Sequence, residues 1–385
     1  MVKRGLWWIL VASLCLAACN KEKPAKPSNT AQTPQPPQLS EALSWSKVPG
    51  WQQDVVQEAW PALSSNCRAL ALKQPIWQVI CTDAATLPNP PDNASARAFF
   101  EKHFTVHQLS LLEGGQQGLM TGYYEPLLMG SFTPDERFKY PLYKTPSDML
   151  TIDLGNVIPE LKDKRIRGRL VEGNKVVPYY ARADIEAPTK PLAGQELLWV
   201  DSREDAFFLE IQGSGRVQLP DGKVIGVNYA NQNGYPYVAI GKPMQTWGML
   251  EAGKVNMFTI KQWLREHPEQ VDQVYHANPS YVFFSLRDQV EAGPLGSLGV
   301  PLTAERSVAV DKKMIELGSV LWVDTTYPDG TQAPLQKLVF AQDTGGAIKG
   351  SLRADFFFGT GKVAEERAGL MARKAEFYML KPKDF

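Results

Sequence analysis

The spacing of apolar residues divides most of the chain into alternating helical and strand-rich stretches. From Trp51 to about His107 the pattern is mostly helical, and the first helix, "WQQDVVQEAW", is predicted to end at Pro61. In a second helix, "ASARAFFEKHF", three aromatic residues fall on one side: Phe99, Phe100 and Phe104. This part of the chain is therefore expected to form helices with one buried face.

Two later stretches carry short apolar runs separated by turn residues, a pattern typical of strands. They extend from about Tyr123 to Ile240 and from about Ser280 to the C-terminus. Each contains a hairpin signal, Asp221-Gly222 in "LPDGKV" and Asp329-Gly330 in the second stretch. Both stretches are therefore predicted to form sheets.

One helix is predicted between these strand-rich stretches. In "TIKQWLREH", Thr259 and Gln262 match a capping box, and Pro268 is expected to end the element. No repeat period or heptad run is visible along the chain. Solenoid and coiled-coil architectures are therefore excluded.

The first residues have the pattern of an export signal, predicted to cover residues 1–18. Lys3 and Arg4 precede "GLWWILVASLCLAA", an apolar run that is short for a membrane span and ends in small residues. The Leu-Ala-Ala-Cys that ends at Cys19 resembles the cleavage motif of bacterial lipoproteins, in which the cysteine is lipidated. Asn20, in place of Asp, favours transfer to the outer membrane in such lipoproteins. The predicted location is the periplasm, with an outer-membrane lipid anchor at Cys19; the alternative is a plain signal peptide.

Residues 19–48 are rich in Pro, Lys, Gln and Ser, and they are predicted to form an extended tether. Cys15 leaves with the signal and Cys19 takes the lipid, so Cys67 and Cys81 are the remaining pair in an oxidising compartment. They form a disulfide or stay as two free buried thiols. Neither alternative makes them catalytic, because they do not belong to a Cys-x-x-Cys motif.

Composition narrows the function classes. The chain has 385 residues, 44% of them hydrophobic and 21% charged, which is ordinary for a globular protein with room for two domains. Lys and Arg number 41 and Asp and Glu number 41, so the formal net charge is zero. Nucleic-acid binding through a global basic field is therefore disfavoured.

Several motifs that resemble known sites are incomplete. "GTGKV" lacks the spacing of a phosphate loop, and "QGSGRVQ" lacks the third glycine of a dinucleotide fingerprint. His103 and His107 have helical spacing, but no further ligand completes a zinc pattern, so a surface or satisfied pair is favoured. None of the four histidines accompanies a Gly-x-Ser-x-Gly elbow, so a Ser-His-Asp hydrolase is unsupported. No metal or cofactor is predicted.

Three aspartates end or interrupt apolar runs in the last stretch: Asp311, Asp343 and Asp355. Such a position raises the pKa of a carboxyl by desolvation and allows it to hold a proton near neutral pH, as a general acid must. Gly345 and Gly346 beside Asp343 allow a tight turn or a close approach to a ligand. The alternative is that these carboxylates bind backbone amides at strand ends.

Ordered motifs resemble one family of cell-wall enzymes. "SVAVDKKMIELGSVLWVD", "AQDTGGAIKG" and "RADFFFGTG" look like the three-aspartate (3D) domain, a double-psi β-barrel. Upstream, "TGYYEPLL", "PYYARADI", "LEIQGSGRVQLPDG", "YPYVAIGK", "NPSYVFF" and "GPLGSLGVPLTAERS" resemble, in order, segments of the membrane-bound lytic transglycosylase A family. The resemblance extends from about residue 50 to the C-terminus.

The resemblance implies a mainly β fold with helices. A double-psi β-barrel catalytic domain, residues 49–128 and 243–385 with the helical segment packed on it, would be interrupted by a smaller β-rich domain. That inserted domain would comprise residues 129–242, and the glycan would lie in a groove between the two.

The resemblance also implies the chemistry. Asp355 would be the catalytic residue, giving its proton to the oxygen between N-acetylmuramic acid and N-acetylglucosamine of peptidoglycan. It would then take the proton of the C6 hydroxyl that attacks C1, so that a 1,6-anhydro ring forms without water or a cofactor. Asp343 would orient substrate or balance charge, and Asp311 would be structural or lie at the groove. Further substrate-binding candidates are Thr121, Tyr123, Tyr124, Gln212, Gly213, Ser214 and Lys349.

Two alternatives remain open at this point. The first is a hydrolase on the same barrel with Asp355 as acid and Asp343 as base, and the second is a wall-binding lipoprotein without activity. The expected partners are peptidoglycan glycan strands, outer-membrane lipid and cell-wall synthesis complexes, with no nucleic acid.

Overall fold

The computed structural model describes residues 35–162, 164–288, 290 and 292–383. The predicted signal, Cys19 and residues 20–34 of the predicted tether lie outside the described residues. Residues 35–48 of that tether are described and pack on the rest of the chain, since Gln38 and Leu39 pair with Ser110 and Leu109 and Val48 is buried. Within the described ranges, no helix is both long and apolar enough to cross a membrane.

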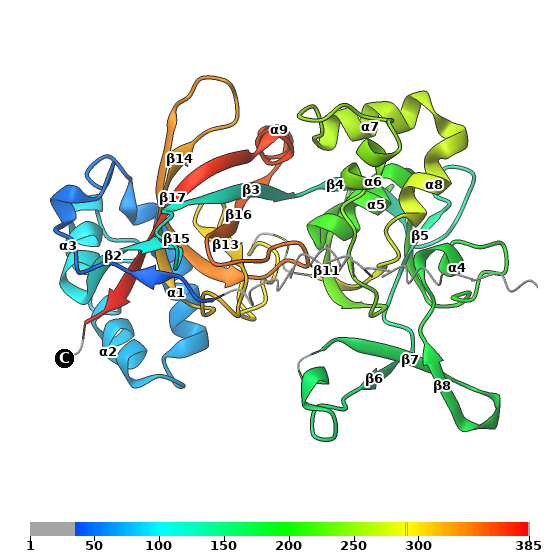
Figure 1. Cartoon of the computed structure of the whole chain (residues 1–385), viewed down its shortest axis with the longest axis horizontal. Coiled ribbons are helices and arrows are strands. Elements are labelled where there is room, and N and C mark those ends of the chain that lie inside the picture. The colour runs from blue at the N-terminus through cyan, green and yellow to red at the C-terminus, as the bar shows by residue number, and fades with distance from the viewer. Residues whose placement is uncertain (1–34, 163, 289, 291, 384–385) are drawn as a thin grey trace, which may run out of the picture. The chain divides into compact units, whose positions relative to one another are not determined.

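A closed sheet organises one part of the chain (Figure 1). Among the described residues its strand order is β1-β2-β17-β14-β15-β13-β16-β3, and β3 also pairs with β17. The six strands from β17 to β3 therefore close on one another as a barrel. The strands of this sheet are β1 (Gln38–Leu39), β2 (Phe104–Ser110), β3 (Gln117–Glu125), β13 (Ser307–Val310), β14 (Val320–Thr326), β15 (Pro334–Asp343), β16 (Arg353–Thr360) and β17 (Ala372–Pro382).

Side chains from alternate strand positions fill the barrel and pack under α9 (Lys362–Leu370). Met120, Val310, Val323 and Phe356 are buried in this cluster, as the two-residue period of strands requires. The opposite face of the same strands carries Thr121 and Asp355. The barrel strands therefore have one apolar face, which is buried in this cluster, and an opposite face that is partly polar.

Three N-terminal helices pack on the barrel beside β2 and β17 (Figure 1). They are α1 (Trp60–Leu70), α2 (Pro75–Ala84) and α3 (Asn93–His103). Phe99 and Phe100 on α3 are buried in the shared cluster with Phe104, which begins β2. The burial predicted for these aromatic residues is confirmed, but the helical position predicted for Phe104 was wrong, since α3 ends at His103. Cys67 on α1 and Cys81 on α2 form a disulfide.

A second sheet and its helices follow β3 along the chain. Its order is β12-β11-β10-β4-β9-β5, and a separate small sheet has the order β6-β7-β8. The strands are β4 (Leu127–Ser131), β5 (Tyr140–Tyr143), β6 (Leu150–Ile152), β7 (Ile166–Val171), β8 (Lys175–Pro178), β9 (Glu196–Val200), β10 (Ser214–Gln218), β11 (Val224–Gln232) and β12 (Val282–Arg287). The helices are α4 (Arg182–Ile185), α5 (Arg203–Gln212), α6 (Gly241–Thr246), α7 (Met257–Glu266) and α8 (Val271–His276). The pairing of β12 with β11 continues this sheet past residue 242, so the chain returns to the barrel after β12.

Both predicted hairpins are confirmed. β10 and β11 are antiparallel and meet at Gly222, whose φ is 85°. β14 and β15 are antiparallel and meet at Gly330, whose φ is 82°. Positive φ is tolerated best by glycine, which explains why these two dipeptides were informative.

Three helix predictions were wrong. Pro61 lies in the first turn of α1 instead of ending a helix, because its missing N–H is not needed there. α7 begins three residues earlier than predicted: Asn256 is its N-cap, and Thr259 occupies the third helical position. α5, within the stretch predicted to be strands and turns, was missed.

Candidate active site

A row of side chains crosses four barrel strands on one face. Thr121 on β3 is the register partner of Asp355 on β16, and Asp355 is the partner of Ala309 on β13. Ala309 is in turn the partner of Asp343 on β15. Directly paired residues project to the same face, so the barrel brings together two of the three predicted aspartates. Neighbouring strands are about 4.8 Å apart, and β13 lies between the strands of Asp343 and Asp355. The Cα atoms of these two aspartates are therefore separated by about 10 Å.

Asp355 lies at the centre of this row with few polar partners. The Thr121 hydroxyl donates a hydrogen bond of 2.5 Å to its Oδ1. Burial by the surrounding protein raises the pKa of Asp355 to about 6, and the negative charge of Asp343 acts in the same direction. The Thr121 hydrogen bond and the charge of Arg353 oppose this rise in pKa. Asp355 can therefore hold a proton near neutral pH and release it, as a general acid and base must.

Asp343 is held by a full set of donors. Its Oδ1 accepts hydrogen bonds from the Ser297 amide (2.9 Å), the Ser297 hydroxyl (3.0 Å) and the Thr344 amide (2.8 Å). Burial raises the pKa of Asp343 above its ordinary value, and these donors offset only part of the rise. The donors stabilise the ionised form of Asp343, and its negative charge in turn raises the pKa of Asp355.

Tyr123 connects the two ends of the row. Its hydroxyl donates a 3.1 Å hydrogen bond to Oδ2 of Asp343, and its ring packs against Phe357 with centroids 5.1 Å apart. Ala309 is buried in the same cluster as Tyr123 and Phe357. Tyr123 is 7% exposed, so its contribution is to hold Asp343 and not to present a ring to solvent.

Asp311 and Lys349 lie at the margin of this region. Asp311, which directly follows β13, accepts hydrogen bonds from the amides of Gly350 (3.1 Å) and Lys313 (3.2 Å). It therefore fixes the loop that leads into β16. Lys349, in that loop, is exposed.

Four other predicted residues do not join the row. Tyr124 projects to the opposite face of β3, where its hydroxyl donates to Glu365 on α9 (3.0 Å). The Gln212 side chain accepts a hydrogen bond from the Tyr124 amide (3.0 Å). Gly213 ends α5 with a φ of 81°, and Ser214 is buried at the start of β10. These residues connect α5 and β10 to β3.

Sequence reasoning missed three residues near the aspartates. Ser297 lies in the quoted segment "GPLGSLGVPLTAERS", but its hydroxyl and amide gave no separate signal. Tyr237 is close enough for the charge of Asp355 to raise its pKa, which burial and that charge bring to about 12. Arg353, two residues before Asp355 on β16, faces the same side, and burial lowers its pKa. Aromatic rings and a cation beside an acid are typical of sites for polar ligands.

The described residues contain no cluster of three or more His, Cys, Asp or Glu side chains suited to a metal ion. His103 ends α3 and makes a 2.5 Å contact with Asp83, whereas His107 lies in β2. The two histidines therefore do not share a helix, and the helical spacing predicted for them was wrong.

Comparison with known proteins identifies two domains in this order. Residues 119–285 match the MltA specific insert domain, and residues 306–381 match the 3D domain. The membrane-bound lytic murein transglycosylase A of Vibrio cholerae is 31% identical over 277 residues, which is 70% of this chain. The match spans 66% of that relative's length, just under two thirds.

Solved structures share the fold over most of their length. The lytic transglycosylase LtgG of Burkholderia pseudomallei is 42% identical with a TM-score of 0.61, covering 91% of this chain and 98% of that one. MltA of Neisseria gonorrhoeae is 33% identical with a TM-score of 0.78, covering 91% and 97% respectively. The mainly β fold with an inserted domain, expected from the sequence, is confirmed. The chain belongs to the membrane-bound lytic murein transglycosylase A (MltA) family.

Proposed function

We propose that this protein is a lytic transglycosylase that cleaves peptidoglycan between N-acetylmuramic acid and N-acetylglucosamine, with Asp355 as the single acid and base. The observation that carries the proposal is the buried position of Asp355 and the raised pKa that results from it. Burial brings the pKa of Asp355 to about 6, and among the described residues its one hydrogen-bond donor is the Thr121 hydroxyl. The names of the relatives support the same activity.

In the first step Asp355 donates its proton to the glycosidic oxygen, and the C1–O bond breaks. The sugar then carries oxocarbenium-like positive charge, which the ionised carboxylates of Asp355 and Asp343 stabilise. In the second step Asp355 accepts the proton of the C6 hydroxyl as that oxygen attacks C1. Bonds and protons balance, and the products are a 1,6-anhydromuramic end and a new N-acetylglucosamine end.

One carboxylate is enough because the attacking hydroxyl belongs to the substrate. An intramolecular nucleophile reacts at a high effective concentration, so no second base is needed to activate water. Asp343 is also poorly suited to activate water, because its oxygens already accept four hydrogen bonds from Ser297, Thr344 and Tyr123. This arrangement favours the transglycosylase over a hydrolase on the same barrel.

A candidate surface for sugar binding lies beside β7 and β8. A hollow of about 630 Å³ is lined by Tyr180, Tyr235 and Arg169, among others. The Arg169 guanidinium lies over the Tyr180 ring at 4.2 Å from its centroid. Aromatic rings and charged groups of this kind bind sugar faces and hydroxyls. We assign glycan binding to this hollow and to the Thr121 side of the row.

The deciding experiment is mass spectrometry of the products formed from purified peptidoglycan. Fragments that end in 1,6-anhydromuramic acid are expected. Reducing ends, one water heavier, would instead establish a hydrolase with Asp343 as a second catalytic group. Intact glycan would leave a wall-binding protein without activity.

The acid role of Asp355 predicts a pH dependence. Asp355 must start protonated, so kcat is expected to fall as pH rises through about 6. The negative charge of Asp343 raises the pKa of Asp355, so Asp343→Asn should move this fall to lower pH. The measurement is kcat between pH 4 and 8 for both proteins, with Asp324→Asn as control, since that carboxylate accepts from Gln336 on a neighbouring strand. An unchanged profile in Asp343→Asn would refute the coupling.

We also propose lipid anchoring at Cys19 to the outer membrane, which the Leu-Ala-Ala-Cys motif supports. Cys19→Ser is expected to move the protein from the membrane fraction to the soluble periplasmic fraction. Fractionation with an antibody measures this, and Cys15→Ser, inside the predicted signal, is the matched control. Retention of Cys19→Ser in the membrane would contradict the anchor.

A further inference from the structure

Gln342 occupies an irregularity in the barrel directly before Asp343. In the parallel pair of β13 and β15, Val308 pairs with Ala341, whereas the next residue, Ala309, pairs with Asp343. Gln342 is therefore the extra residue of a β-bulge. Without it, Asp343 would shift by one position and project to the other face of the strand.

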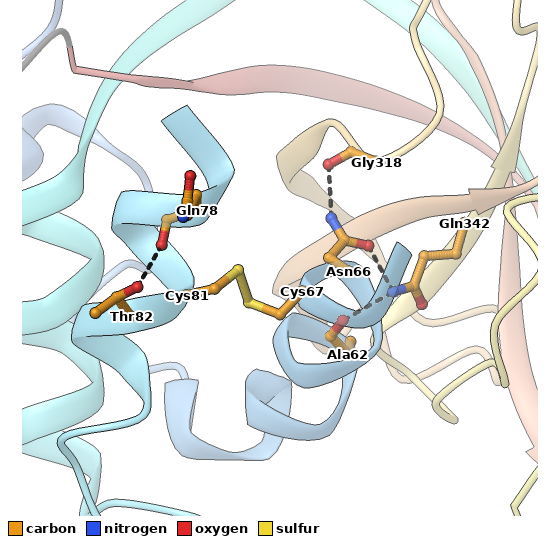
Figure 2. Close-up of a disulfide and its surroundings, with 8 residues drawn as sticks. All are labelled: Ala62, Asn66, Cys67, Gln78, Cys81, Thr82, Gly318 and Gln342. Carbon is orange, nitrogen blue, oxygen red and sulfur yellow. Dashed lines mark hydrogen bonds between the residues drawn. A yellow bond between two sulfur atoms is a disulfide. The ribbon is translucent and has the colours of Figure 1, made fainter. Parts of the chain in front are cut away.

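The Gln342 side chain is fully buried, and both the nitrogen and the oxygen of its amide are hydrogen-bonded. Figure 2 shows the partners of the nitrogen. The Gln342 Nε2 donates to the Ala62 carbonyl and to Oδ1 of Asn66, both at 2.8 Å, and both residues lie on α1. Its Oε1 accepts a 2.7 Å hydrogen bond from the Ser307 hydroxyl. A buried amide with these partners has one stable orientation.

The backbone of Gln342 holds the loop that binds Asp343. Its carbonyl accepts the Leu298 amide at 3.0 Å. A Cβ at Gly296 would come within 2.4 Å of the same carbonyl, so the loop can approach this closely only with glycine there. Ser297, between these two residues, donates twice to Asp343. Gln342 thus determines both the direction of Asp343 and the place of its donors.

α1 is itself fixed at the position of these contacts. The Asn66 Nδ2 donates to the carbonyl of Gly318, which lies just before β14, at 2.7 Å. Asn66 also accepts from Gln342, so it connects β15 to the start of β14. The next residue, Cys67, is bonded to Cys81 of α2 (Figure 2). The amide of Gln342 is therefore held by a helix that is cross-linked to its neighbour.

We propose that Gln342 is a positioning residue for the reaction, holding the β15 bulge through α1 so that Asp343 faces Asp355. The inference rests on the proposed function, since it assigns a task to Asp343 within it. Gln342 does not touch substrate. Its effect reaches the reaction through the carboxylate of Asp343.

The test is Gln342→Met, which keeps the volume of the side chain and removes its hydrogen bonds. We expect kcat on peptidoglycan to fall about tenfold with KM unchanged, and the fall of kcat with pH to shift to lower pH, as in Asp343→Asn. The matched control is Leu338→Ala, a fully buried apolar residue on the same strand and in the core shared with α1. It is expected to lower Tm while leaving kcat and the pH profile of the folded protein unchanged.

A second variant covers the case in which Gln342→Met does not fold. Ser307→Ala removes one hydrogen bond to Gln342 and is expected to reduce kcat by a smaller factor in the same direction. Folded Gln342→Met or Ser307→Ala with wild-type kcat and pH profile would overturn the inference, as would an equal loss of kcat in Leu338→Ala. These results differ from failure of the proposed function, in which the unmodified full-length protein releases no anhydromuramic products.

Discussion

Replacing Asp355 by asparagine is expected to reduce cleavage of peptidoglycan by about 10²- to 10⁴-fold. The amide has almost the same shape and still accepts a hydrogen bond from Thr121 in place of the carboxylate. It cannot donate the proton to the glycosidic oxygen or remove the proton from the C6 hydroxyl. The release of anhydromuramic fragments per enzyme and minute measures the effect.

The control for this prediction is Asp324→Asn. Asp324 is also a barrel carboxyl whose pKa burial raises, but its hydrogen bond is to Gln336. The Asp324→Asn variant is expected to retain wild-type turnover. Glycan binding by Asp355→Asn should persist in a pull-down with insoluble peptidoglycan. Substantial turnover by Asp355→Asn would exclude Asp355 as the acid.

The largest expected effect on stability is at Asp54. Its carboxylate accepts two hydrogen bonds, of 2.7 and 2.8 Å, from the Arg306 guanidinium, and both side chains are 1% exposed. Asp54 Oδ2 also accepts the Leu338 amide of β15 at 3.1 Å. Asp54→Ala removes the only fully buried carboxylate that pairs with Arg306 among the described residues and leaves the exposed Glu58 as its remaining acidic partner, which costs about 3–5 kcal/mol. The free energy of unfolding from urea titration should fall by this amount.

Glu58→Gln is the matched comparison for Asp54→Ala. Glu58 contacts the same Arg306 at 2.8 Å, but its side chain is 52% exposed. Exposed ion pairs contribute about 0–1 kcal/mol, so the free energy of unfolding should change little. Similar losses in the two variants would show that burial does not determine the strength of these pairs.

The aspartates were recognisable in the sequence because each one interrupts an apolar run. That pattern identified Asp343 and Asp355 as carboxyls in desolvated positions, and the family motifs pointed to Asp355 as the acid. It did not show that Asp343 and Asp355 share Ala309 as a neighbour, because that arrangement depends on one extra residue in β15. The extra residue of this bulge is Gln342, and glutamine is not typical of bulges in the way that glycine is. The shift in register was therefore not visible in the sequence.

Tyr123 and Tyr124 show a second limit of the sequence. Adjacent strand residues face opposite sides, so only one of the two tyrosines can lie in the row. The sequence did not determine which, because both faces of β3 are covered, one by α9 and one by the cluster around Phe357. Helix ends were similarly ambiguous, since proline both stops helices and begins them, as Pro61 does in α1.

Closure of the barrel also determines when the protein can fold. Thr121 on β3 hydrogen-bonds Asp355 on β16 across 234 residues of chain, and β3 also pairs with β17 near the C-terminus. Contacts this distant in sequence form slowly. Asp355 therefore acquires its surroundings only after almost the whole chain has been synthesised, and a chain cut short before β16 has neither a closed barrel nor Asp355. Until β16 and β17 have been synthesised, β3 has no partner strand on either side. Its unpaired edges make the incomplete chain prone to aggregation.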